Sequence, residues 1–144
     1  MQTIQELLYA RGLNPQAKIK MVRHKIQTVN LDEKYRLEYD KFLQYQSEQR
    51  KPFFEDVNYI VSFVGEDSTL SRFIGVFEIV GVTNLPIAKK TTYGEGEYNF
   101  LYEMKKLDEF EDLEDKIVVD WHNPISWHQW LQTSNSGGIV EVRK

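Results

Sequence analysis

The sequence predicts an α+β fold, either a mostly antiparallel twisted sheet or a small β-barrel, with flanking N-terminal helices. Two observations support this class. Helical periodicity is confined to the first third of the chain. Of roughly six strand-like segments, one lies between the two helical stretches and the others follow them without further helices between them. A doubly wound fold would alternate strands and helices instead.

Length and composition are those of one domain with a hydrophobic core. The chain has 144 residues, of which 41% are hydrophobic and 13% aromatic. It has no cysteine, no apolar run long enough to cross a membrane and no signal-peptide pattern at the N-terminus. We therefore expect a cytoplasmic location, no membrane partner and neither disulfides nor thiolate chemistry.

Two helices are expected near the N-terminus. The first covers 3–11, where Thr3 and Glu6 form a capping box and Gly12 marks the end. The second covers 30–49, where apolar and aromatic residues recur at helical spacing.

The remaining pattern predicts a sheet. Gly75 and Gly81 lie inside one expected strand and indicate a bulge, a barrel bend or a close backbone approach by a ligand. A loop is expected at 84–97, and a turn pinned by Phe110 at 108–115. Strands are expected at 18–25, 57–64, 72–82, 98–104, 117–119 and 139–143.

Charge is distributed unevenly although the net charge is only −4. Residues 16–51 hold nine Lys or Arg against five Asp or Glu, whereas 95–120 hold three against ten. Such an asymmetry permits one face to bind nucleic acid, but it is equally typical of two solvated surfaces.

The most informative stretch is 116–131, KIVVDWHNPISWHQWL, which contains every tryptophan of the chain. Three indoles beside polar side chains favour either a core corner or an aromatic pocket for a flat ligand. If SWHQWL forms a helical turn, Trp127 and Trp130 share one face. The candidate ligand-binding residues are Trp121, Trp127, Trp130, Asp120, Ser126 and Gln129.

Basic residues supply the candidate contacts to a nucleic-acid backbone, because phosphates are bound by Lys and Arg. Most of them lie in the expected strand at 18–25. The set is Lys18, Lys20, Arg23, His24, Lys25 and Arg72.

Catalytic signatures are absent from the sequence: it has no G-x-S-x-G, HExxH or Walker motif. His122 and His128 with Asp120 match no standard metal spacing. Glu114-Asp115-Lys116 is similar to half of a restriction-type nuclease core. Its partner acid would have to be Asp56 or Asp67. We predict no catalytic residue, metal or cofactor.

Several segments together resemble a bacterial domain associated with GIY-YIG-nuclease-type proteins. They are VRHK, FLQYQSEQ, NYIVSFVGEDSTLSRFIGVFEIVGV and DLEDKIVVDWHNPISWHQWL. The resemblance covers about 18–142, without the GIY-YIG motifs themselves. It implies that 1–144 is a single recognition domain, the N-terminal part of a longer chain, with a nuclease module beyond Lys144. The β-rich content is also similar to PUA-like and EVE-like modules, which read modified or flipped bases; this is an analogy of architecture.

The leading hypothesis is therefore a non-enzymatic nucleic-acid recognition module, with DNA favoured over RNA. It would hold a flipped or modified base in an aromatic pocket and target a fused nuclease. The alternative is a protein–protein adaptor or dimerisation domain without a nucleic-acid ligand. A Mg²⁺-dependent nuclease using Asp120 or Glu114 is a third, weaker interpretation.

Overall fold

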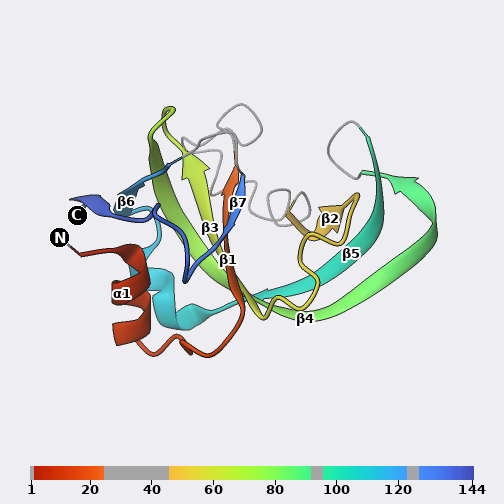
Figure 1. Ribbon diagram of the computed structural model, residues 1–144, viewed down its shortest axis with the longest axis horizontal. Helices are drawn as coiled ribbons and strands as arrows, with labels where there is room; N and C mark the ends of the chain where they lie inside the picture. Colours follow the sequence, from red (N-terminus) through yellow and green to blue (C-terminus); the bar gives the residue numbers. More distant parts are fainter. Residues whose placement is uncertain (1, 25–45, 92–95, 123–126) are drawn as a thin grey trace.

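The computed structural model describes residues 2–24, 46–91, 96–122 and 127–144 (Figure 1). In these ranges a short helix, a 3₁₀ helix and eight strands follow one another along the chain. They are α1 (Ile4–Ala10), β1 (Ile19–His24), β2 (Glu48–Gln49), β3 (Tyr59–Gly65), β4 (Leu70–Lys90), β5 (Glu97–Lys106), η1 (Asp108–Leu113), β6 (Ile117–Asp120), β7 (His128–Trp130) and β8 (Ile139–Val142).

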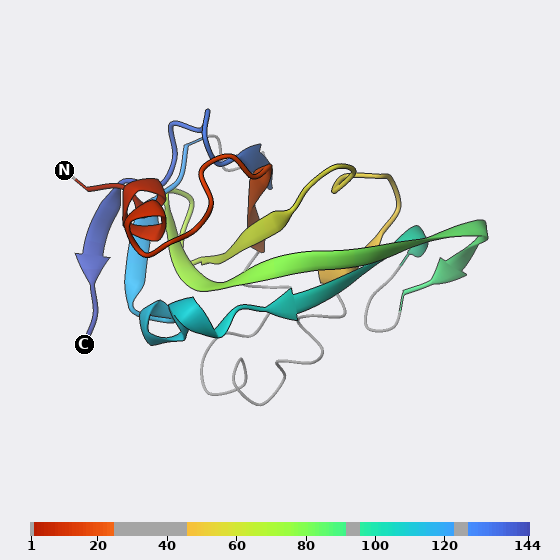
Figure 2. The same ribbon diagram turned by 90° about the horizontal axis from the view of Figure 1, so that it is seen from below.

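The strands form one open, mixed sheet, which confirms the predicted α+β class. Its order is β2-β5-β4-β3-β1-β7, and β6 pairs with both β4 and β8. The β1–β3 pair is parallel, and the other pairs are antiparallel. In Figures 1 and 2, α1 and β8 lie at one end of the molecule, and the β4–β5 hairpin extends to the other. We call the projecting part of this hairpin the arm; it comprises residues 80–90 of β4 and 97–103 of β5.

Strand β4 is long and strongly curved because its pairing is interrupted at two glycines. Gly75 has a φ of 150° and lies opposite a register shift between Ser62 and Phe63. A second shift lies between Ile79 and Gly81. These irregularities confirm the predicted bulges, since an extra residue bends the strand.

The predicted loop at 84–97 is wrong over most of its described part. Strand β4 continues to Lys90, because Lys89 and Lys90 pair with Tyr98 and Glu97 of β5. Pro86 lies in a gap of the ladder between Asn84 and Lys89, where its missing N–H costs no hydrogen bond.

The first predicted helix is confirmed. The Thr3 hydroxyl accepts a hydrogen bond from the Glu6 N–H at 3.1 Å, and Gly12 follows the helix with a φ of 106°. Most of the second predicted helix lies outside the described residues. Its last two residues, Glu48–Gln49, instead form β2 and pair with Leu101 and Phe100. No helix in the described ranges is long and apolar enough to span a membrane.

Side chains alternate between two faces of the sheet, and each face has its own hydrophobic cluster. On the first face, the main core packs against α1 and η1. It includes Ile4, Leu8, Ile19, Met21, Val61, Phe63, Phe73, Phe110 and Trp121. On the second face, a smaller cluster comprises Val22, Phe54, Val57, Ile60 and Tyr102, with Phe53, Ile79, Phe100, Met104 and Trp127 packed against it.

Candidate functional site

The three tryptophans do not meet in one pocket. Trp121 is 2% exposed and belongs to the core of the first face, with its ring 5.5 Å from that of Phe63. The main-chain N–H of Trp121 donates to the Thr69 carbonyl at 2.7 Å and so continues the pairing of β6 with β4. Trp127 is half-buried on the second face, whereas Trp130 is 42% exposed. Trp121 is therefore a core residue, contrary to its predicted role as a pocket wall.

Residues His128–Trp130 form the strand β7 rather than a helical turn. In β7, His128 pairs with Val22 and Trp130 with Lys20 of β1. The Arg23 N–H donates to the Trp127 carbonyl at 2.7 Å, so Trp127 continues this ladder. Because directly paired residues share a face, His128 and Trp130 lie on the second face with Lys20 and Val22.

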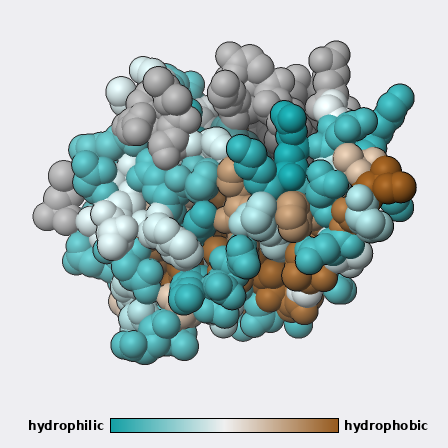
Figure 3. Space-filling view, turned by 45° about the vertical axis from the view of Figure 1, so that its right-hand side comes forward, coloured by the Kyte–Doolittle hydropathy of each residue, from teal (hydrophilic) through white to brown (hydrophobic). Residues whose placement is uncertain are grey.

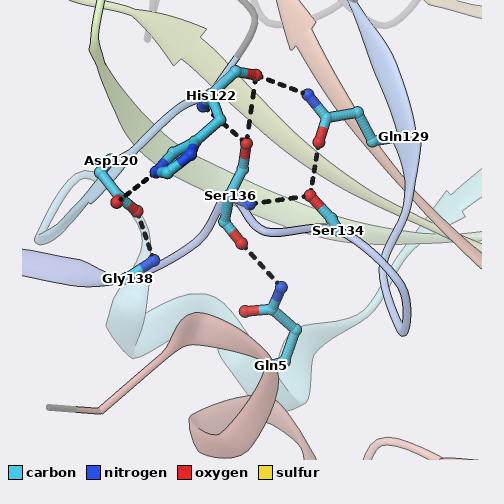
Figure 4. Close-up of polar contacts among 7 residues, drawn as sticks. All are labelled: Gln5, Asp120, His122, Gln129, Ser134, Ser136 and Gly138. Carbon is cyan, nitrogen blue, oxygen red and sulfur yellow. Dashed lines mark hydrogen bonds and ion pairs between the residues drawn. The ribbon is translucent and has the colours of Figure 1, made fainter.

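Asp120 takes part in a network of hydrogen bonds that fixes the C-terminal turn (Figure 4). Its carboxylate accepts from the Gly138 N–H at 2.6 Å and lies 3.0 Å from His122 Nε2. The Ser136 hydroxyl accepts from the His122 N–H at 2.7 Å, and the Ser136 carbonyl accepts from Gln5 of α1 at 2.8 Å. These contacts tie the turn to the N-terminal helix.

This network has the residue types of a catalytic triad but not its geometry. The Ser136 hydroxyl contacts the main chain of His122 rather than its imidazole, and the Ser134 hydroxyl donates to Gln129 Oε1. Gln129 also donates to the His122 carbonyl at 3.0 Å. Since Gln129 pairs with Met21, it faces away from His128 and Trp130. Ser126 lies outside the described residues.

The predicted basic strand is an interior strand, which corrects the expectation that its cations face solvent. Lys20 is 8% exposed, and its Nζ donates to the Phe53 carbonyl at 2.7 Å. The same ammonium lies 3.2 Å from His128 Nδ1 and 4.9 Å from the centre of the Trp130 ring. Burial lowers the pKa of Lys20. An ammonium can only donate, so His128 Nδ1 must accept.

Two further predicted phosphate contacts have protein partners. Arg23 Nε donates to the Ser71 hydroxyl at 2.8 Å, and another of its nitrogens donates to the Asp67 carbonyl. Arg72 Nε lies 3.6 Å from Glu66 and 3.7 Å from Asp115. Both guanidinium groups therefore support the sheet.

Exposed cations lie instead at the edge of the second face. Lys18 is exposed just before β1, and Arg50 and Lys51 are exposed just before Phe53. The pattern R-K-P-F-F, which places two cations beside two aromatic residues, could have indicated this position from the sequence. Lys25 lies outside the described residues.

A buried polar trio lies on the second face, at the end of β1 opposite to Lys18. It consists of His24, Gln46 and Ser62, all at most 8% exposed. Gln46 Oε1 accepts from the Ser62 hydroxyl and lies 3.0 Å from His24 Nε2, so His24 carries its proton on Nε2. Burial lowers the pKa of His24 to about 4, which keeps the imidazole neutral. Gln46 Nε2 donates to the Met104 sulfur at 3.4 Å.

Aromatic rings surround Trp127 on the same face. The Trp127 ring meets Phe53 edge-on with centroids 4.9 Å apart, Phe54 at 6.2 Å and His128 at 4.4 Å. Edge-to-face pairs of this kind stabilise one another beyond simple burial. The ring of His128 belongs to the same group, and His128 pairs with Val22, which in turn pairs with Ser62 of the trio.

The second face thus combines an aromatic wall with polar groups that a purely structural sheet would not bury. Polar side chains cost free energy in a core unless each hydrogen bond is made. In the described part of the chain, the acceptor recorded for the Gln46 amide is a thioether, which is a weak acceptor. Among the residues that the structure describes, the Gln46 amide N–H therefore makes only a weak hydrogen bond.

The metal and nuclease interpretations gain no geometric basis among the described residues. These contain no group of three or more His, Cys, Asp or Glu suited to a metal ion. Glu114 is half-buried and lies 3.1 Å from Lys106 Nζ, and burial raises its pKa. Asp67 accepts from the N–H groups of Thr69 and Leu70 in a turn.

Comparisons of the chain with protein-family models, curated proteins and solved structures found no match.

Proposed function

We propose that this domain is a nucleic-acid recognition module that holds an unpaired or flipped base against the second face of its sheet. The carrying observation is that the aromatic group around Trp127 and the buried His24–Gln46–Ser62 trio lie on the same face of the sheet, on either side of Val22, which pairs with both Ser62 and His128. A base needs an aromatic surface for its ring and hydrogen-bonding groups for its edge. The second face has both within one hydrophobic cluster.

The hydrogen-bonding chemistry favours a base edge with a carbonyl. The Gln46 oxygen already accepts hydrogen bonds from Ser62 and His24. Its amide nitrogen is therefore the group that would donate to the base. A ring carbonyl would replace the Met104 sulfur as a stronger acceptor. The low dielectric of the site would strengthen that bond.

The phosphates would lie along the exposed cations Lys18, Arg50 and Lys51 rather than along β1. The net charge of −4 makes tight non-specific binding unfavourable, so affinity must depend on the base contact and on these few cations. The resemblance to the GIY-YIG-associated domain implies that such recognition would target a nuclease module in the same polypeptide, with DNA as the preferred ligand.

The test is a titration of the intrinsic tryptophan fluorescence with short single strands of each base and with duplexes containing one bulged, methylated or hydroxymethylated cytosine. We expect quenching that Gln46→Ala weakens at least tenfold, and that Gln129→Ala, on the other face, leaves unchanged. Lys51→Ala should weaken all ligands alike and reduce the slope of log affinity against log salt by about 1.

Thermal melts of both glutamine variants establish that they fold. Absence of quenching with any DNA or RNA at low salt would count against the proposal. Equal binding by Gln46→Ala and the parent protein would remove Gln46 as the reading group.

A further inference from the structure

We propose that two copies of this chain dock through their arms, each placing Ile87 in a groove of the other. This inference is independent of nucleic-acid binding. It rests on two features of the arm that match each other in shape and charge, namely a groove at its base and an apolar and cationic segment near its tip.

The groove lies between the arm and the turn that precedes β3, and its volume is about 390 Å³. That volume falls within the range of roughly 300–1,000 Å³ that is typical of ligand pockets. Its apolar lining comes from both sides and includes Phe54, Val57, Ile79, Val82, Phe100 and Tyr102. Val82 is 54% exposed at the opening, so the groove presents apolar surface to solvent.

The rim of the groove is acidic. Glu55 and Asp56 are the charged residues of its lining, and both are exposed. An ordered turn presents them, since the Glu55 N–H donates to the Pro52 carbonyl and the Val57 N–H to the Phe54 carbonyl. An apolar floor with two carboxylates beside it suits an aliphatic side chain followed by cations, and it repels a phosphate backbone.

The arm of the same chain carries such a segment. Ile87 is 78% exposed, the most exposed of the large hydrophobic residues described. Lys89 and Lys90 follow it at the end of β4, and both are exposed. Figure 3, which turns the arm towards the viewer, shows hydrophobic surface among the hydrophilic residues on this side. Exposed apolar positions on a projecting ribbon favour association unless something covers them.

A two-fold axis between two copies would form the apolar contact and the charged contact at the same time. Val82 precedes the register shift of β4 between Asn84 and Lys89, and Ile87 lies within it. Two arms side by side in opposite directions, with the axis between these positions, place each Ile87 over the other copy's Val82. The same operation brings Lys89 and Lys90 towards Glu55 and Asp56. One patch is thereby complementary to itself, as an isologous dimer requires.

The first experiment is light scattering coupled to gel filtration, with sedimentation equilibrium from micromolar to millimolar protein. We expect a concentration-dependent dimer, and Ile87→Asp should weaken its dissociation constant at least tenfold. A protein that stays monomeric throughout, or an Ile87→Asp variant that dimerises as the parent does, overturns the proposal. Capture of another polypeptide by a strictly monomeric domain would likewise refute self-docking.

Charge exchange gives the decisive test. One variant carries Glu55→Lys with Asp56→Asn, in which asparagine tolerates the φ of 60° found at position 56. The other carries Lys89→Glu with Lys90→Glu. Each variant alone should be monomeric. In the first the rim and the tip are both cationic, and in the second both are acidic. An equimolar mixture should form a heterodimer, since both of its contacts are again between opposite charges.

The matched control reverses two exposed lysines away from the arm, Lys116→Glu with Lys144→Glu, and should dimerise like the parent. Circular dichroism establishes the fold of each variant. If the two charge variants remain monomeric when mixed, or if the control also dissociates, the paired contact of groove and tip is wrong.

Discussion

The two faces of the sheet are built from alternate residues of the same strands, yet they differ in kind. On β1, Ile19 and Met21 enter an apolar core that α1 and η1 close. Lys20, Val22 and His24 enter the second face, where a lysine and a histidine are buried among aromatic rings. The second face also opens into a groove, whereas the first is covered.

This difference separates stability from recognition. A close-packed apolar face contributes most of the free energy of folding. Buried polar groups add little net stability, and each costs free energy if a partner is lost. If a ligand binds, the second face is therefore where it would find hydrogen-bonding groups that contribute little to the stability of the fold.

The largest expected effect is a truncation on the first face. Phe63 is fully buried and packs against Phe73 and Trp121, so Phe63→Ala should lower the free energy of unfolding by about 3–5 kcal/mol. Phe53→Ala, the same change on the partly open second face, should cost about 1–2 kcal/mol. Urea unfolding at pH 7.5 measures both. Equal losses would mean that the two faces are equally close-packed.

The second effect is a pH dependence specific to the second face. The pKa of His24 is lowered to about 4, so its contribution is complete above pH 6.5 and is lost as pH falls towards 4, because the unfolded chain binds the proton first. By pH 5 the loss should reach about 2 kcal/mol.

Urea unfolding from pH 7.5 to 5 checks this expectation. His24→Gln, which keeps a donor for Gln46, should remove a large part of this dependence, and the lowered pKa of His128 should account for a remainder of the same sign. His122→Gln changes a half-exposed imidazole and should leave it intact. A parent protein whose stability is constant between pH 6.5 and 5 would contradict a buried neutral His24.

Local signals predicted the elements whose contacts are close in sequence. Thr3 and Glu6 marked α1, and the alternation from Tyr98 to Met104 marked β5. The arm was missed because Pro86 and the lysines are loop-like in composition, whereas the pairing that makes them a strand lies on β5.

The site was predicted only in part for the same reason. Strand alternation within the predicted 18–25 strand puts Lys20 and His24 on the same face, which is where the structure has them. That this face is buried depends on Phe53 and Phe54, which the sequence does not place against it. The separation of Trp121 from Trp127 depends likewise on the tertiary pairing of β6 with β4 and β8, and of β7 with β1.

The smallest effect compares one hydroxyl on each face, both fully buried. Ser71 accepts from the Arg23 guanidinium, so Ser71→Ala leaves a cationic donor without that partner and should cost about 1.5–3 kcal/mol. Ser62→Ala leaves the Gln46 oxygen bonded to His24 and should cost about 0.5–1 kcal/mol.

Urea midpoints at constant slope resolve the expected difference of about 1 kcal/mol. The first-face hydroxyl completes an ion's hydrogen bonds, whereas the second-face hydroxyl is one of two donors to the same amide oxygen. If Ser62→Ala lowers the free energy of unfolding as much as Ser71→Ala does, the trio serves to stabilise the fold, and its amide is not available for a ligand. The base-reading role of Gln46 would then lose its physical basis, even if the domain binds nucleic acid elsewhere.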